Sequence, residues 1–400
     1  MPPRLLDLTD QVPRLLLRER GMLKGPYAAL SYCWGPNLTF LKLTAENLNQ
    51  MCLQVLLGDL PLTFQHAVMV TKRLGISYLW VDSLCILQSG EGSSADWQKH
   101  LTEMHLVYQN CFVCIALAHV PDPTRGVFTP RNAALLKVPQ VSFSETTYTL
   151  VDAKRFEERR RTPLASRAWV LQERMLSPRV LTFDKDQIFW DCSKVEYACE
   201  AFPSGAPPCP KNKHTPLGEL PGPFSLPTII RNDVEGYQLW SSVVLDYSQR
   251  NLTYPSKDKL VALSGIAEQM VQILGDSYAA SFFTRTLPWS LMWRTSRNDQ
   301  ISGRIRLAEP KRAPSWSWAK VDGPVYFSMR RKEDLAKRYS PGDFSMLKDV
   351  HVTLVDDSNK FGQVRSAALT LWDPTTFAKP KSTPMDESGM WDPDADPDVL

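Results

Sequence analysis

The chain has 400 residues, of which 43% are hydrophobic, and this length suits two or three packed domains. Its 46 basic and 43 acidic residues leave a net charge of only +3, whereas a dedicated nucleic-acid-binding protein normally carries a strong basic excess. Twelve Trp, twelve Tyr and sixteen Phe supply ample surface for a core, which excludes disorder of the whole chain.

No apolar run reaches the ~18 residues that a transmembrane helix needs, and the N-terminal MPPRLLDLTDQVPRL lacks the apolar centre of a signal peptide. We therefore expect a soluble, cytoplasmic protein. Cys111 and Cys114 have a metal-like spacing, but they lie in the strand-like run CFVCIALA. Residues three apart on a strand point to opposite faces, so we expect two buried thiols and no metal site.

In chain order, the first expected element is a buried strand at 27–32. A helix follows, with Thr63 as its N-cap and Gly75 as its C-terminal stop. The next run, 76–87, is rich in strand formers and is interrupted by Asp82. These elements begin an alternation of strand and helix.

A helix starting near Asp96 and a buried strand at 112–118 continue the alternation, which predicts a parallel α/β sheet. At 100° per residue, one face of this helix is apolar, with His100 on its border and Glu103 toward solvent. The apolar residues are Trp97, Leu101, Met104 and Tyr108.

The second half shows weaker patterns, which predict a mixed α+β region. We expect a helix at 169–174, one strand over 179–191 and an amphipathic helix at 258–274. Eight of the 27 residues in 202–228 are proline, which is typical of a linker or long loop. Trp316 and Trp318 are two residues apart, so we place them in the core on one face of a strand.

Residues 385–400 contain six acidic and no basic side chains, as in a disordered tail, and the other 384 residues carry +9. The patterns divide the chain into six parts. These are a lead-in (1–26), an α/β domain (27–175), a strand-rich continuation (176–201), a Pro-rich linker or loop (202–228), an α+β extension (229–384) and the acidic tail.

Six sequence blocks occur in order and resemble the fungal heterokaryon incompatibility (HET) domain family. They include YAALSYCWG (27–35), LPLTFQHAVMVTKRLGISYLWVDSLCILQ (60–88), PLASRAWVLQERMLSPRVLTFDKDQIFWDC (163–192) and RAPSWSWAKVDGP (312–324). The resemblance implies a role in fungal non-self recognition, in which cell death follows the fusion of incompatible partners, with self-association or docking on a partner protein. HET domains are in turn similar to TIR domains, which implies a flavodoxin-like core. Some TIR domains cleave NAD, so NAD is the implied substrate and a nucleotide the implied ligand.

Candidate site residues lie where the predicted strands end. Asp82 follows the strand near 78–81, at the sheet edge where open α/β sheets bind ligands, although it could instead cap the next turn. Tyr32 and Trp34 follow the first strand at the same edge. Trp34 would either stack on a nucleotide or close the end of the core.

The block RAWVLQER supplies Arg167, Trp169 and Glu173. Arg167 and Glu173 are six residues apart, so they are not a simple helical ion pair. We favour a buried network of arginine and carboxylate that ties the extension to the α/β domain, with Trp169 and Glu173 as structural residues. The alternative is that Arg167 contacts a nucleotide and that Glu173 is catalytic.

Two positions depart from the family pattern, because His66 and His100 stand where its members usually carry acidic residues. We expect His100 at the edge of the same pocket as Tyr32, Trp34, Asp82 and Arg167. A carboxylate near the sugar would lower the barrier to cleaving NAD, and a neutral imidazole supplies no such charge. Asp82, Glu103 and Glu173 are the remaining catalytic candidates. Three hypotheses follow: a HET-domain effector of cell death, an NAD-cleaving hydrolase, and a non-catalytic regulatory binding module.

Overall fold

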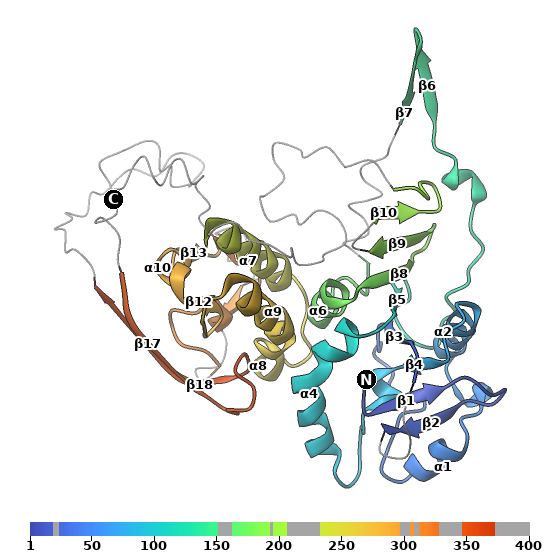
Figure 1. The fold of residues 1–400 in the computed structure, drawn as a ribbon, viewed down its shortest axis with the longest axis horizontal. Helices are drawn as coiled ribbons and strands as arrows, with labels where there is room; N and C mark the ends of the chain where they lie inside the picture. Colours follow the sequence, from blue (N-terminus) through green and yellow to red (C-terminus); the bar gives the residue numbers. More distant parts are fainter. Residues whose placement is uncertain are drawn as a thin grey trace.

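The computed structural model describes residues 1–18, 24–150, 162–192, 195–205, 233–296, 305–307, 312–327 and 346–372. The first half folds around an eight-stranded sheet in the order β10-β9-β8-β5-β3-β4-β1-β2 (Figure 1). The second half, residues 233 onward, is called the extension below and packs beside this sheet. The two halves have separate hydrophobic cores.

The centre of the sheet is parallel, as the sequence predicted. It consists of β3 (Tyr27–Ser31), β4 (Tyr78–Trp80), β5 (Val113–Leu117) and β8 (Arg179–Phe183). Every residue of β3 and β5 is buried, because both faces of these strands are covered. From β3 the chain first adds β4 on one side and then β5 on the other. Such a reversal creates a crevice at the carboxyl ends of the strands.

Antiparallel strands complete both sides of the sheet. On one side β1 (Arg4–Asp7) and β2 (Arg14–Leu17) come from the expected N-terminal lead-in. On the other side lie β9 (Ile188–Cys192) and β10 (Val195–Cys199). The prediction of one strand over 179–191 was wrong, because the polar run 184–187 reverses the chain between β8 and β9.

Helix α2 (Leu62–Arg73) buries the predicted face and ends before Gly75, which has φ +70°. The predicted N-cap was wrong: Pro61 occupies that position, and the Thr63 hydroxyl donates to the carbonyl oxygen of Arg125 at 2.6 Å. The shorter helices of this half are α1 (Leu48–Leu53) and α3 (Asp82–Cys85). The run 76–87 is therefore strand only at β4.

Helix α4 (Ser93–Gln109) begins three residues earlier than expected, and its buried face is rotated. Trp97, predicted on the apolar stripe, is 38% exposed, whereas His100 is 1% exposed. The reason is tertiary packing. The extension packs against α4 through α9 (Ser264–Leu274), so His105 also becomes buried.

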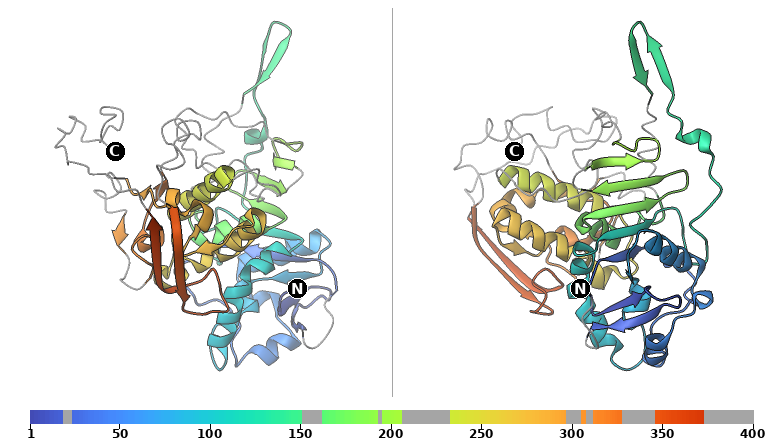
Figure 2. Two further views of the ribbon diagram at one scale, coloured as in Figure 1. Left: turned by 60° about the vertical axis from the view of Figure 1, so that its left-hand side comes forward. Right: turned by 45° about the vertical axis from the view of Figure 1, so that its right-hand side comes forward.

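The extension contains α7 (Asp233–Ser248) and α9 (Figure 2). Its core includes Trp240, Tyr247 and Trp318. The predicted helix 258–274 is broken into α8 (Pro255–Asp258), a 3₁₀ turn and α9. The remaining described elements are α10 (Leu287–Ser290) and the strand pairs β11–β12 (Tyr278–Ala279, Phe282–Phe283), β13–β16 (Trp293–Arg294, Tyr326–Phe327), β14–β15 (Arg306–Leu307, Val321–Asp322) and β17–β18 (Met346–Leu354, Val364–Trp372).

The expected strand around 314–319 is absent from the described residues, which form a turn and a 3₁₀ helix there. Trp318 is nevertheless fully buried, and Trp316 stacks on Phe282 with ring centroids 5.9 Å apart. Most of the Pro-rich segment 202–228 and the whole acidic tail lie outside the described residues. No helix of the described chain has the length and apolarity to cross a membrane.

One hairpin projects from the body of the molecule (Figures 1 and 2). It consists of β6 (Gln140–Phe143) and β7 (Thr146–Thr149), and all eight strand residues are exposed. Helix α6 (Ala168–Leu176) follows it in the chain and lies between the sheet and the extension. This helix positions the candidate site.

Candidate functional site

The site begins with Asp82, which starts α3 directly after β4. Its Oδ1 accepts hydrogen bonds from the Tyr32 hydroxyl at 2.7 Å and from the Ser83 backbone N–H at 2.6 Å. Its Oδ2 accepts from the indole N–H of Trp34 at 2.7 Å. The structure therefore brings together three residues that the sequence placed at one sheet edge. We call Tyr32, Trp34 and Asp82 the Asp82 cluster.

The cluster is tightly held. The rings of Tyr32 and Trp34 stack with centroids 6.5 Å apart, and Phe64 of α2 packs edge-on against Tyr32. Burial raises the pKa of Asp82, while hydrogen bonds from Tyr32 and Trp34 act in the opposite direction. Both carboxylate oxygens already have donors, so Asp82 ties the residues after β3 to the start of α3.

Helix α6 adds two more of the predicted residues. Arg167 occupies the N-cap position of α6, and its guanidinium donates to the backbone carbonyl of Tyr32. Burial raises the pKa of Glu173 to about 6, opposed first by the positive charge of Arg167 and then by the Ser31 hydroxyl. The charge of Arg167 also opposes the effect of burial on the pKa of Asp82. One cation therefore compensates two half-buried carboxyl groups near the end of β3.

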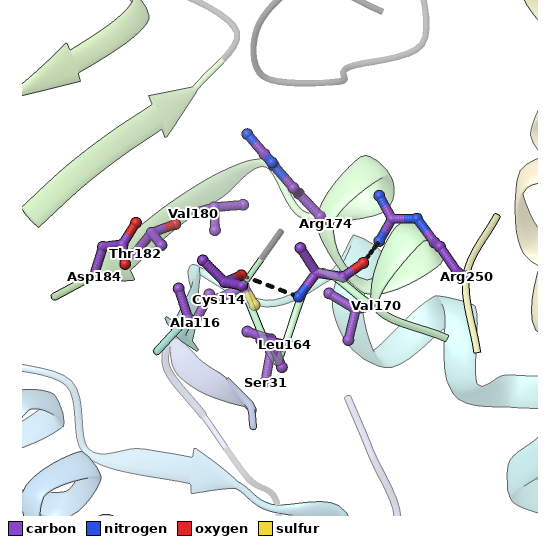
Figure 3. A pocket seen from close by; sticks show the side chains of 13 residues that line it. Ser31, Cys114, Ala116, Leu164, Val170, Arg174, Val180, Thr182, Asp184 and Arg250 are labelled. Atoms are coloured by element: carbon purple, nitrogen blue, oxygen red, sulfur yellow. Dashed lines mark hydrogen bonds between the residues drawn. The ribbon is translucent and has the colours of Figure 1, made fainter. Parts of the chain in front are cut away.

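A small cavity lies next to Ser31, at the end of β3, between the sheet and α6 (Figure 3). No residue of the Asp82 cluster lines it. Its volume is about 40 Å³, room for roughly three waters, whereas sites for drug-sized ligands usually measure about 300–1,000 Å³. The residues that line it include Ser31, Cys114, Val170, Arg174, Thr182 and Arg250. Arg174 pairs with Asp191 at 3.2 Å, and Arg250 pairs with Asp246 at 2.8 Å. A cavity of this volume cannot hold a nucleotide.

Residues 27–173 match the family model described as Heterokaryon incompatibility protein (HET). The chain carries a HET domain. No curated protein and no solved structure matches the chain. The matched segment begins at the first residue of β3 and ends at Glu173, so it contains the Asp82 cluster, Arg167 and Glu173.

His100 lies in a different part of the HET domain from the one we expected. Its Nδ1 is 2.8 Å from the backbone oxygen of Asp96 and 3.5 Å from the Asp96 carboxylate, which itself pairs with Arg4. Burial lowers the pKa of His100, and its Nε2 has no hydrogen-bond partner among the described residues. His100 is not among the residues that line the cavity.

The remaining sequence-predicted residues are distributed over both halves. Glu103 lies on α4, where its charge acts on His100 and His105. Trp169 packs against both hydrophobic cores and donates from its indole nitrogen to Asp258 at 3.4 Å. Trp316 and Trp318 belong to the extension core. Of the expected pocket residues, Tyr32, Trp34, Asp82 and Arg167 meet, and His100 lies elsewhere. The catalytic candidate Glu103 also lies apart from them.

His66, the second departure from the family pattern, also has a local explanation. Its Nδ1 accepts from the backbone N–H of Val127 at 3.0 Å, and its ring lies 4.5 Å from that of Phe128. Burial lowers its pKa, so the imidazole is neutral and acts as an acceptor, a role that a carboxylate could also fill.

Sequence reasoning missed the residues that fasten α6 to the extension. The N–H of Ala168 donates to the Asn251 carbonyl at 2.9 Å, and the N–H of Asn251 donates to the Ser166 carbonyl at 2.6 Å. Gln172 accepts from the Gly265 N–H at 2.8 Å. Because these bonds use backbone groups distant in sequence, composition and periodicity carry no signal of them. Among the described residues, no cluster of His, Cys, Asp or Glu is arranged to hold a metal.

Proposed function

We propose that this chain is a HET-domain effector of heterokaryon incompatibility in a fungus, and that it promotes cell death by self-association or by docking on a partner protein. The observation that carries the proposal is the match of residues 27–173 to the HET family. The site geometry favours a protein-interaction role over catalysis, because both oxygens of Asp82 have donors and the adjacent cavity is about 40 Å³.

The proposal includes a TIR-like, flavodoxin-like core. Its support is the order of the four parallel strands. Numbered along the chain, β3, β4, β5 and β8 lie in the order 2-1-3-4, which is the order of the flavodoxin-like sheet. In such sheets the ligand site lies at the strand reversal, which here falls beside β3.

NAD cleavage is the second candidate, because burial raises the pKa of Glu173 to about 6 at the sheet edge where ligands bind. A carboxyl group with that pKa can exchange a proton near neutral pH. Purified protein incubated with NAD tests this candidate. If wild type cleaves NAD and a folded Glu173→Gln variant does not, the enzymatic function is supported. If neither form cleaves NAD, the interaction role is favoured.

Deletion of the gene tests the role in incompatibility. A deletion strain would be paired with a panel of wild isolates, and heterokaryon formation would be scored against the parent strain. We expect at least one pairing that is incompatible with the parent to become compatible with the deletion strain. Unchanged outcomes across a panel that contains incompatible pairings would overturn the proposal.

A further inference from the structure

Helix α6 belongs to two hydrophobic cores. Val170 packs in the core of the HET domain, whereas Ala168, Leu171 and Met175 pack in the core of the extension. Trp169 contacts both cores. The helix therefore cannot change its position over the sheet without breaking apolar contacts with the extension.

Polar contacts fix the same helix from the extension side. Gln172 is 1% exposed, and its side-chain oxygen accepts the buried N–H of Gly265 at 2.8 Å. The chain around Ser166 and Ala168 pairs with Asn251 in two backbone hydrogen bonds. Because a buried polar group without a partner is costly, these bonds hold α6 in place against the extension.

The approach of α9 is close enough to require glycine. A Cβ atom at Gly265 would lie 2.1 Å from the Cβ of His105 on α4 and 2.8 Å from the Gln172 side-chain oxygen. One helix turn further along α9, Glu268 Oε2 lies 3.0 Å from His105 Nε2. The extension thus contacts both α4 and α6 around Gly265.

The opposite side of α6 faces the sheet and closes one side of the cavity. Arg167 holds the Tyr32 carbonyl, and Val170 and Arg174 line the small cavity. Arg250, which belongs to the extension, also lines the cavity and donates to the Ala165 carbonyl at 2.8 Å (Figure 3). Enlarging the cavity therefore requires both α6 and the segment around Arg250 to move.

We propose that the extension is an autoinhibitory latch, which holds α6 over the carboxyl edge of the HET-domain sheet through the Gly265 contact. Release of α9 from α4 and α6 frees α6 and opens the cavity that Val170, Arg174 and Arg250 line. This inference rests on the proposed effector function for its consequence in the cell, but the opening itself is a physical property of the chain.

Hydrogen exchange on the full-length protein tests the latch with Gly265→Ala, whose new Cβ would clash with His105. We expect exchange at residues 27–34 and 164–176 to become at least fivefold faster, although the substitution lies in the extension. Gly58→Ala is the matched control, because a Cβ there meets nothing within 4 Å. If Gly265→Ala does not fold, Gln172→Ala removes the acceptor of the same contact and carries the same expectation.

Faster exchange confined to α9, with residues 27–34 unchanged, would overturn the latch. Induced expression of the same variants then separates the latch from the proposed function. More rapid killing by the opened variant than by wild type supports both, and equal killing by both forms overturns the autoinhibition. If Gly265→Ala shows the faster exchange but neither this variant nor wild type kills cells, the effector function is contradicted, whereas the latch itself is still supported.

Discussion

At the scale of single residues, Asp82 organises the candidate site because its three hydrogen bonds come from different parts of the chain. Tyr32 and Trp34 follow β3, and Ser83 belongs to α3. An amide at position 82 would place N–H groups against a donor, since the indole nitrogen of Trp34 can only donate.

We therefore predict that Asp82→Asn lowers the free energy of unfolding by about 1–3 kcal/mol. Urea unfolding followed by tryptophan fluorescence measures it. Asp10→Asn is the control, because the Asp10 side chain is 66% exposed and should change stability little. A stability of Asp82→Asn equal to that of the control would show that the cluster contributes nothing to the fold.

Glu173 gives a pH-dependent prediction. Its pKa of about 6 in the folded chain lies above its ordinary value of 4.5, so the folded state favours the protonated form. The associated stability is fully present below pH 4.5 and is lost as the pH rises through 6. Glu173→Gln removes this ionisation, so the variant should be more stable than wild type at pH 8 by roughly 1–2 kcal/mol.

The gain should shrink to near zero at pH 4.5, because both side chains are then neutral. Thermal unfolding across this pH range provides the measurement, with the exposed Glu91→Gln as control. A gain of the same size at both pH values would contradict the assignment of a raised pKa to Glu173.

The residues of the Asp82 cluster could be predicted from sequence because each follows a recognisable strand, and strand ends meet at one sheet edge. The placement of His100 could not. Its side chain lies on the border of the apolar stripe by helical periodicity, and burial of that border depends on how Arg4, Asp96 and the extension pack around α4. The cavity was likewise beyond prediction, since residues from three strands, α6 and Arg250 enclose it.

At the scale of elements, the runs and spacing of apolar residues predicted β3, α2, β5 and α6 well. Errors arose where a short polar run changed the structure, as in the turn between β8 and β9, or where Trp residues suggested a strand around Trp318. Trp318 is buried as part of a 3₁₀ turn in the extension core. An aromatic residue alone does not distinguish a buried strand from such a turn.

The β6–β7 hairpin supplies a prediction at this scale. Val141, Phe143 and Tyr148 are 49–75% exposed on one face of the hairpin, so it buries little apolar surface. Replacing residues 140–149 with a short Gly-Ser linker should therefore change the melting temperature by less than about 2 °C. Differential scanning calorimetry measures this, and a loss of 5 °C or more would mean that the hairpin supports the fold.

At the scale of the whole molecule, the two cores meet at α6 and Trp169, so the HET domain and the extension should behave as one unit. The tail is different, because residues 385–400 have six like charges and no periodic apolar face. Truncation after Pro384 should leave the melting temperature within about one degree. A loss of several degrees would show that the tail docks on the rest of the chain. Because the other 384 residues carry +9, basic side chains are the first candidates for the contact.

The central claim is that the chain is a HET-domain effector whose action does not depend on NAD cleavage. Induced expression of the full-length protein in a fungal host, with viability and NAD measured in the same cells, tests it most directly. The account predicts that viability falls within hours and that NAD stays at the level of the uninduced control until cells die. Full viability, or a loss of NAD that precedes death and disappears in Glu173→Gln, would contradict it.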